Sequence, residues 1–272
     1  MDRKANGSPL RVIIAVAVLA AASAGMGYIA GRVSIDPETP AVRSEPTAPP
    51  SLPEPILPEV TLGRSDIIDL ANSVADAVSG GPAFDDMMEG QRFILRLPFG
   101  CGQSAPDEGE RAASYTVRDE TVRVRVLPED WTDVPWIASE LSRRGAAGAE
   151  GFWIPRPWTG AEACPPGATE PADRSSTLGI AQVFDAASSR VEQRRGRALE
   201  ATVQVGPDEA DFSKGLRLVI EGRITRWPGG RATVLCHVAG AYQRPVCLVG
   251  TKLDRISIEN PANDERLADW AY

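Results

Sequence analysis

The sequence predicts an α+β fold, rich in β-strands paired as antiparallel hairpins, with one soluble helix over about residues 66–79 and a single transmembrane helix ahead of it. Three observations predict this class. Apolar residues recur every three or four positions after Ser65, they alternate with polar residues between Tyr115 and Val126, and no charge interrupts residues 12–31. These patterns are typical of an amphipathic helix, a half-buried hairpin and a membrane span, respectively.

The first 31 residues have the composition of a membrane anchor. Residues 1–11 form a short basic stub, and residues 12–31 form an apolar segment that Arg32 closes. As a helix this segment extends about 30 Å, which matches the hydrocarbon core of a bilayer. Basic residues ahead of a span favour a cytoplasmic N-terminus. We therefore expect residues 12–31 to contact the lipid bilayer of the inner, cytoplasmic membrane, and the C-terminal domain to be periplasmic or extracellular.

A cleavable signal peptide is the alternative interpretation of the same segment. Ala22-Ser23-Ala24 is an acceptable cleavage site, and the apolar run Val12–Ala21 precedes it. Apolar residues continue beyond this site, which favours a retained anchor. In both interpretations, the rest of the chain is exported from the cytoplasm.

Residues 32–60 are predicted to be a disordered, proline-rich linker. Eight prolines lie between Pro37 and Pro58, among Glu, Ser, Thr and Ala residues. Each proline fixes its own φ and restricts the residue before it, so neither a helix nor a sheet interior is expected. A polyproline-like chain extends about 3.1 Å per residue. The linker would hold the exported domain, residues 61–272, away from the membrane.

The exported domain begins with the predicted helix and continues mainly as strands. Ser65 is a suitable N-cap for the helix, and Gly80-Gly81-Pro82 ends it. The hairpin Tyr115–Val126 turns at Asp119-Glu120, which places its apolar residues on one face. Further strands are predicted at Phe93–Phe99, Thr177–Phe184, Ala198–Val205, Leu216–Ile220, Ala232–Val238, Val246–Gly250 and Arg255–Glu259.

Two strand pairings are expected in the C-terminal half. Pro228-Gly229-Gly230 would turn the strand at Leu216–Ile220 toward Ala232–Val238. The strands at Val246–Gly250 and Arg255–Glu259 would form a further pair.

All four cysteines follow the membrane segment, which predicts two disulfide bonds formed in an oxidising compartment. Four cysteines allow three pairings. Cys236 and Cys247 would face each other across a hairpin, where the separation of the Cβ atoms suits a disulfide, and this leaves Cys101 with Cys164. Because the sequence has no Cys-x-x-Cys motif and no closely spaced ligand pair, a thiol oxidoreductase and a four-cysteine zinc site are not expected.

Composition excludes several further classes of function. The formal net charge is −8 at pH 7, whereas nucleic-acid binding needs clustered Lys and Arg. The chain has one histidine, which excludes a histidine-rich metal site. This residue, His237, is interpreted as an ordinary strand histidine. No phosphate-binding or nucleophile motif is present, so neither a cofactor nor a metal is expected.

Tryptophans gather between residues 131 and 158, most densely in Phe152–Trp158. Two interpretations remain open for them. The rings could fill the core beneath a Cys101–Cys164 disulfide, or they could form a surface that binds a protein or a glycan. The candidate binding residues are Trp153, Arg156 and Trp158, with Arg194 and Arg195 from a separate basic segment.

These features lead to two hypotheses for the function. The first is a non-enzymatic binding or scaffolding protein of the cell envelope, whose partner is an envelope protein or a glycan. The second is a periplasmic hydrolase that acts on cell-wall glycan or peptide with paired carboxylates. Its candidate carboxylates flank the tryptophan region, at Glu129, Asp130, Asp133, Glu140 and Glu150. The sequence assigns a catalytic role to none of them.

Overall fold

The computed structural model describes residues 60–101, 112–167, 176–185, 193–194, 196–206 and 211–272. Residue contacts divide the chain into Met1–Pro55 and Ile56–Tyr272, and every described residue belongs to the second unit. The predicted stub, membrane span and linker lie outside the described residues, apart from position 60. Among the residues that are described, neither helix is long and apolar enough to cross a membrane.

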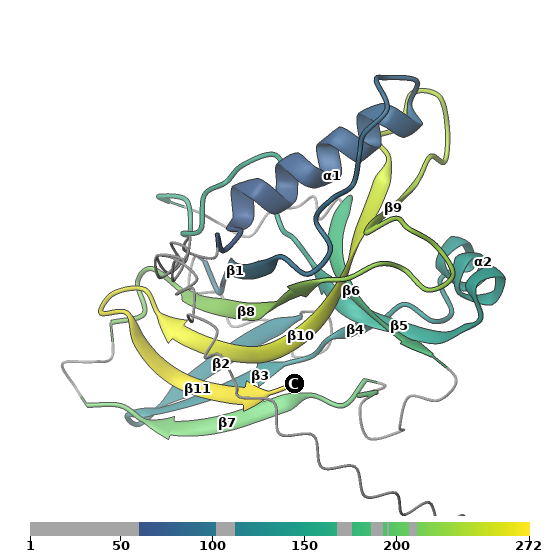
Figure 1. The fold of residues 1–272 in the computed structure, drawn as a ribbon. Coiled ribbons are helices and arrows are strands. Elements are labelled where there is room, and N and C mark those ends of the chain that lie inside the picture. The colour runs from purple at the N-terminus through teal and green to yellow at the C-terminus, as the bar shows by residue number, and fades with distance from the viewer. Residues whose placement is uncertain (1–59, 102–111, 168–175, 186–192, 195, 207–210) are drawn as a thin grey trace, which may run out of the picture. The chain divides into compact units, whose positions relative to one another are not determined.

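The described domain is an α+β fold in which strands predominate, as predicted (Figure 1). Its two helices are α1 (Arg64–Val78) and α2 (Pro135–Arg144). Its strands are β1 (Arg92–Phe99), β2 (Ala113–Arg118), β3 (Thr121–Val126), β4 (Glu129–Asp130), β5 (Ala146–Trp153), β6 (Leu178–Asp185), β7 (Leu199–Gln204), β8 (Leu216–Ile224), β9 (Val234–His237), β10 (Val246–Asn260) and β11 (Glu265–Ala271).

These strands form a large mixed sheet and a small antiparallel one. The large sheet has the order β1-β8-β10-β6-β5-β4, and β9 and β11 also pair with β10. The small sheet has the order β2-β3-β7. Strand β6 runs parallel to β10, whereas the other described pairs are antiparallel. A fold built of antiparallel hairpins alone is therefore an incomplete prediction.

The hairpin β2–β3 has the predicted register and turn. Tyr115 lies opposite Val124, and Val117 lies opposite Val122. The two turn residues, Asp119 and Glu120, have φ of 46° and 63°. A two-residue turn with positive φ at both positions is of type I′, whose twist matches that of the strands.

We expect the substitution Glu120→Gly to raise the free energy of unfolding by about 0.5–1 kcal/mol. Glycine adopts positive φ without the steric cost that a Cβ imposes, and this gain exceeds its larger entropy in the unfolded chain. Urea denaturation measures the change. The matched control is Glu129→Gly in β4, where φ is not positive and the same substitution should destabilise the domain. Equal losses for both variants would contradict the explanation.

The predicted pair of strands at Val246–Gly250 and Arg255–Glu259 is wrong. Both segments belong to β10, which is one continuous strand of 15 residues. The register shifts between Leu253 and Arg255, as in a β-bulge, which lets one strand continue through the polar stretch that suggested a turn. The first half of β10 pairs with β6 and β9, and the second half pairs with β8 and β11.

The predicted pairing of Leu216–Ile220 with Ala232–Val238 is also wrong. Strand β8, which contains the first segment, pairs with β1 and with the second half of β10. The turn at Pro228-Gly229-Gly230 leads instead to β9, which pairs with the first half of β10. Strands β8 and β9 therefore follow each other along the same edge of β10 and do not pair with each other.

The helices differ from the prediction in number and in capping. Helix α2 and strand β5 have no counterpart among the predicted elements. Pro135 begins α2, Gly145 ends it with φ of 69°, and its buried residues are Ile137 and Leu141. Two buried residues give only a short apolar stripe, so this segment lacks the longer periodic pattern that predicts an amphipathic helix. Helix α1 begins two residues before the predicted start: its N-cap is Gly63, whose N–H donates to Asp66 Oδ2 at 2.7 Å, rather than Ser65.

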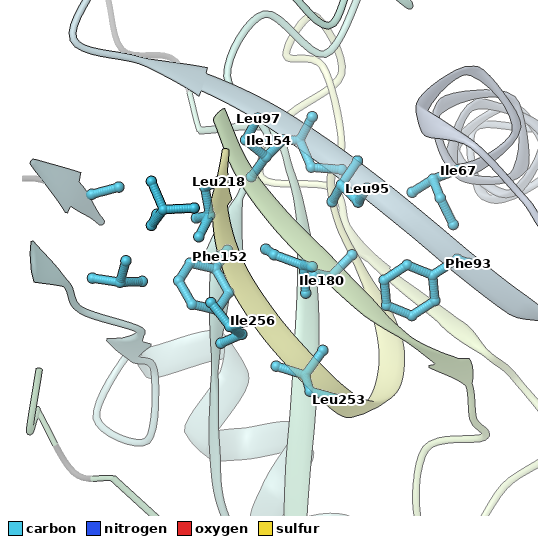
Figure 2. Close-up of a cluster of buried hydrophobic side chains, with 14 of the residues drawn as sticks. Ile67, Phe93, Leu95, Leu97, Phe152, Ile154, Ile180, Leu218, Leu253 and Ile256 are labelled. Atoms are coloured by element: carbon cyan, nitrogen blue, oxygen red, sulfur yellow. The ribbon is translucent and has the colours of Figure 1, made fainter. Parts of the chain in front are cut away.

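Hydrophobic clusters lie on both faces of the large sheet. On one face, Ile67 of α1 packs with Phe93 of β1 and Ile180 of β6 (Figure 2), together with buried valines of β3. On the other face, α2 covers a cluster that contains Trp131, Ala181 and Leu248. Successive side chains of a strand point to opposite faces, so Ile180 and its neighbour Ala181 join different clusters.

Candidate functional site: a fixed tryptophan loop beside a hollow

The segment Ile154–Gly167, which we call the Trp158 loop, follows β5 and carries the most exposed of the candidate tryptophans. The side chain of Trp158 is 63% exposed. Pro155 and Pro157 have no N–H to donate to a neighbouring strand, so the sheet pairing of β5 ends just before them. Between them, Arg156 has φ of 51°, a left-handed conformation that is costly for a residue with a Cβ. Such a conformation persists only where surrounding contacts hold it.

Arg64, the first residue of α1, supplies the main contact. Its side chain is 1% exposed although arginine is rarely buried. Its Nε donates to the carbonyl oxygen of Thr159 at 2.9 Å, and its Nη2 donates to those of Pro155 and of Arg156, the latter at 3.1 Å. One guanidinium thus satisfies three carbonyl groups of the loop.

The pKa of Arg64 shows that burial disfavours the charged form of its guanidinium. Burial and, secondly, the nearby charge of Arg156 lower the pKa of Arg64 to about 10, against the opposing effect of Glu162. Arg64 remains charged at neutral pH, and hydrogen bonds from a charged donor are stronger than those from a neutral one. The three carbonyl contacts offset part of the desolvation of the guanidinium.

Other contacts fix the second half of the loop. Cys164 forms a disulfide with Cys101, which follows β1, and the Cα atoms are 5.5 Å apart. Arg156 Nη2 donates to the carbonyl oxygen of Ala163 at 2.9 Å, and Glu162 lies 3.7 Å from Arg96 of β1. Gly160 packs against α1 so closely that a Cβ there would lie 2.2 Å from Ser65 Oγ. The loop is therefore tied to both α1 and β1.

A hollow of about 930 Å³ borders the same loop. Its wall combines flat apolar groups with charged and hydroxyl side chains: Glu162, Ala163, Cys164, Pro165, Pro166, Gly167, Ser213, Lys214, Arg217, Pro261 and Asp264. Arg217 Nη2 and Asp264 Oδ1 form an ion pair at 2.5 Å. Among the described residues, no ion pair within 4 Å involves Lys214. Ala163 belongs to the wall of this hollow, and its hydrogen bond from Arg156 connects the wall with the part of the loop that carries Trp158.

The other candidate binding residues lie elsewhere. The Trp153 ring packs on Trp131 with 4.7 Å between the ring centroids, next to the cluster beneath α2. The Arg194 guanidinium lies 5.4 Å from the centroid of the Tyr272 ring. Arg195 lies outside the described residues. The structure thus brings Arg156 and Trp158 together on one loop and places Trp153 and Arg194 apart from them.

The remaining aromatic residues support the core-filling interpretation for part of the tryptophan region. Trp131 is fully buried. Trp136 of α2 stacks on His237 of β9, with 5.2 Å between the centroids and 7° between the planes. His237 is therefore a strand residue covered by a ring. Of the four tryptophans between residues 131 and 158, Trp158 is the one that is largely exposed.

The candidate carboxylates have mainly structural contacts. Burial raises the pKa of Glu140, but hydrogen bonds from Arg143 and Arg144 outweigh this effect and lower it. Asp130 and Glu150 lie opposite each other in the β4–β5 pair and line a hollow of about 240 Å³.

Both members of that opposed pair accept hydrogen bonds from the backbone. Glu150, which is buried, accepts from Arg194 N at 2.9 Å, and Asp130 accepts from Thr132 N at 2.9 Å. Burial and the neighbouring charge of Glu150 raise the pKa of Tyr272, against the opposing effect of Arg194. Among the described residues, no three metal-ligating side chains form a group.

Comparisons of the chain with protein-family models, with curated proteins and with solved structures found no match. The geometry of the Trp158 loop is therefore the basis for assigning a function.

Two parts of this site have no recognisable pattern in the sequence. Arg64 occupies the first turn of an amphipathic helix, where a solvated arginine is the usual outcome. Lys214 and Arg217 lie about 50 residues from the loop that they adjoin. Only the density of tryptophan and proline in Phe152–Trp158 points to this segment.

Proposed function

We propose that this protein is a non-enzymatic binding protein of the cell envelope. Residues 12–31 anchor it in the inner membrane, the proline-rich linker spans the distance to the exported domain, and that domain binds its partner through the Trp158 loop. The observation that supports this proposal best is the 63% exposure of a tryptophan on a loop held by Arg64 and by a disulfide.

The physical argument concerns conformational entropy. Binding normally loses part of its favourable free energy in ordering loops and side chains. Here the fold has already ordered the Trp158 loop, and the ring that it presents is of a residue type that dominates binding energies at interfaces. Backbone strain at Arg156 fits the same interpretation, because strained residues cluster at functional sites.

The two disulfides support the extracytoplasmic location. Cys101–Cys164 and Cys236–Cys247 are both formed, and no described cysteine is free. Disulfides of this structural kind form in oxidising compartments and are rare in the cytosol.

A photo-crosslinking residue placed at position 158 of the full-length protein tests the proposal in intact cells. We expect an adduct from position 158, either with a protein of defined mass or with wall glycan. The matched control is position 242, because Tyr242 is also an exposed aromatic residue but lies on the β9–β10 hairpin. Adducts that are absent, or equal in mass and amount from the two positions, would contradict binding through the Trp158 loop.

A further inference from the structure

We propose that the Trp158 loop and the hollow beside it bind a glycan chain of the cell wall, built of β-1,4-linked N-acetylated amino sugars. This inference rests on the proposed function, and it names the class of ligand. It follows from the surface of the hollow, the balance of charge along it and its size.

The site contains both flat apolar groups and hydrogen-bonding groups. Trp158 and the three prolines of the hollow offer flat apolar surfaces. The C–H groups on one face of a pyranose ring carry slight positive charge and pack well on the negative face of an aromatic ring. Proline rings offer similar flat surfaces. The methyl group of an acetamido substituent on the sugar can pack against such a surface.

The polar side chains of the hollow include both donors and acceptors. Ser213, Lys214 and Arg217 carry hydrogen-bond donors, whereas Glu162 and Asp264 carry acceptors. Sugar hydroxyl groups do both, and an acetamido group offers one N–H and one C=O. Such a ligand can satisfy both kinds of group in the wall of the hollow.

The charge balance disfavours the main alternative ligands. Lys214 and Arg217 bring two positive charges to the hollow, and Glu162 and Asp264 bring two negative ones. A binding site for a phosphate or a nucleic acid would need an excess of positive charge. An apolar side chain from a protein partner would remove water from four charged groups. It would form no hydrogen bonds in place of those that the water had made with these groups. A neutral polyhydroxylated ligand avoids both penalties.

The size of the hollow favours an oligosaccharide over a single sugar. Its volume of about 930 Å³ lies near the upper end of the range for small-molecule pockets, which is about 300–1,000 Å³. Trp158 lies on the same loop as residues 162–167 of the wall, and we infer that a chain of several sugars contacts both the hollow and this ring.

Calorimetric titration of the full-length protein in detergent micelles with chitotetraose, the tetramer of N-acetylglucosamine, tests the proposal. We expect saturable binding with a Kd below about 1 mM. Trp158→Ala should weaken it by about tenfold or more, and Lys214→Met by a smaller factor. Tyr242→Ala is the control for an exposed aromatic residue and should leave the Kd unchanged. Urea midpoints equal to that of the wild type show that the variants are folded.

Other outcomes would overturn the inference in distinct ways. Absence of binding to chitotetraose and to peptide-free wall glycan strands excludes the glycan. If position 158 still crosslinks to a protein, the proposed function stands with a protein partner, whereas loss of both results removes the proposed function as well. Binding that Trp158→Ala and Lys214→Met leave unchanged, or equal binding of dextran, would show that the site or its specificity is wrong.

Discussion

Replacement of Arg64 by methionine is expected to lower the free energy of unfolding by about 2–3 kcal/mol and to release the Trp158 loop. Methionine fills much of the space of the arginine stem but cannot donate to the carbonyl oxygens of Pro155, Arg156 and Thr159. Each buried acceptor left without a partner costs about 1–3 kcal/mol. Relief from burying the guanidinium, whose pKa is lowered to about 10, offsets part of this loss.

Two measurements separate the loss of the contact from a general loss of stability. Urea denaturation gives the change in free energy, and limited proteolysis under native conditions reports whether the loop opens. Arg143→Met is the matched control because that side chain is 66% exposed and pairs with Glu140 on the surface of α2. We expect at most about 0.5 kcal/mol for this control. Arg64→Lys should behave like Arg64→Met because an ammonium lacks the planar fork that reaches several carbonyl oxygens. Unchanged proteolysis of the loop in Arg64→Met would contradict its role as the anchor.

The local features of this fold were predictable from the sequence because local chemistry determines them. The alternation of apolar and polar residues in Tyr115–Val126 specifies a hairpin, and its register follows from the position of the turn. The pairing of Cys236 with Cys247 follows from the same reasoning, since residues opposite each other in β9 and β10 have adjacent Cβ atoms.

Features that depend on distant partners were not predictable in the same way. The bulge that lets β10 pass from one set of neighbours to another depends on the strands beside it, and these come from separate parts of the chain. The candidate site divides in the same manner. The sequence indicated Arg156 and Trp158 by composition, but the role of Arg64 depends on a contact across 95 residues, for which periodicity carries no information.

Removal of the Cys101–Cys164 disulfide is expected to have the largest effect of any change considered for this domain. The bond closes a loop with a sequence separation of 63, whereas Cys236–Cys247 closes one of 11. In the chain-entropy model, these bonds contribute about 4 and about 3 kcal/mol to stability. Because domain stabilities are about 5–15 kcal/mol, either loss is serious. We therefore expect Cys101→Ser with Cys164→Ser to lower the urea midpoint more than Cys236→Ser with Cys247→Ser.

The structure adds a second difference between the two double variants. Cys236 and Cys247 lie opposite each other in β9 and β10, where backbone hydrogen bonds hold the strands together without the disulfide. Cys164 belongs to the Trp158 loop, so its loss removes a covalent anchor from the wall of the hollow. Native-state proteolysis near Trp158 should thus increase in the Cys101/Cys164 variant and remain at the wild-type level in the Cys236/Cys247 variant. A larger loss of stability in the Cys236/Cys247 variant would show that packing around the buried Cys247, rather than loop closure, determines the contribution of these bonds.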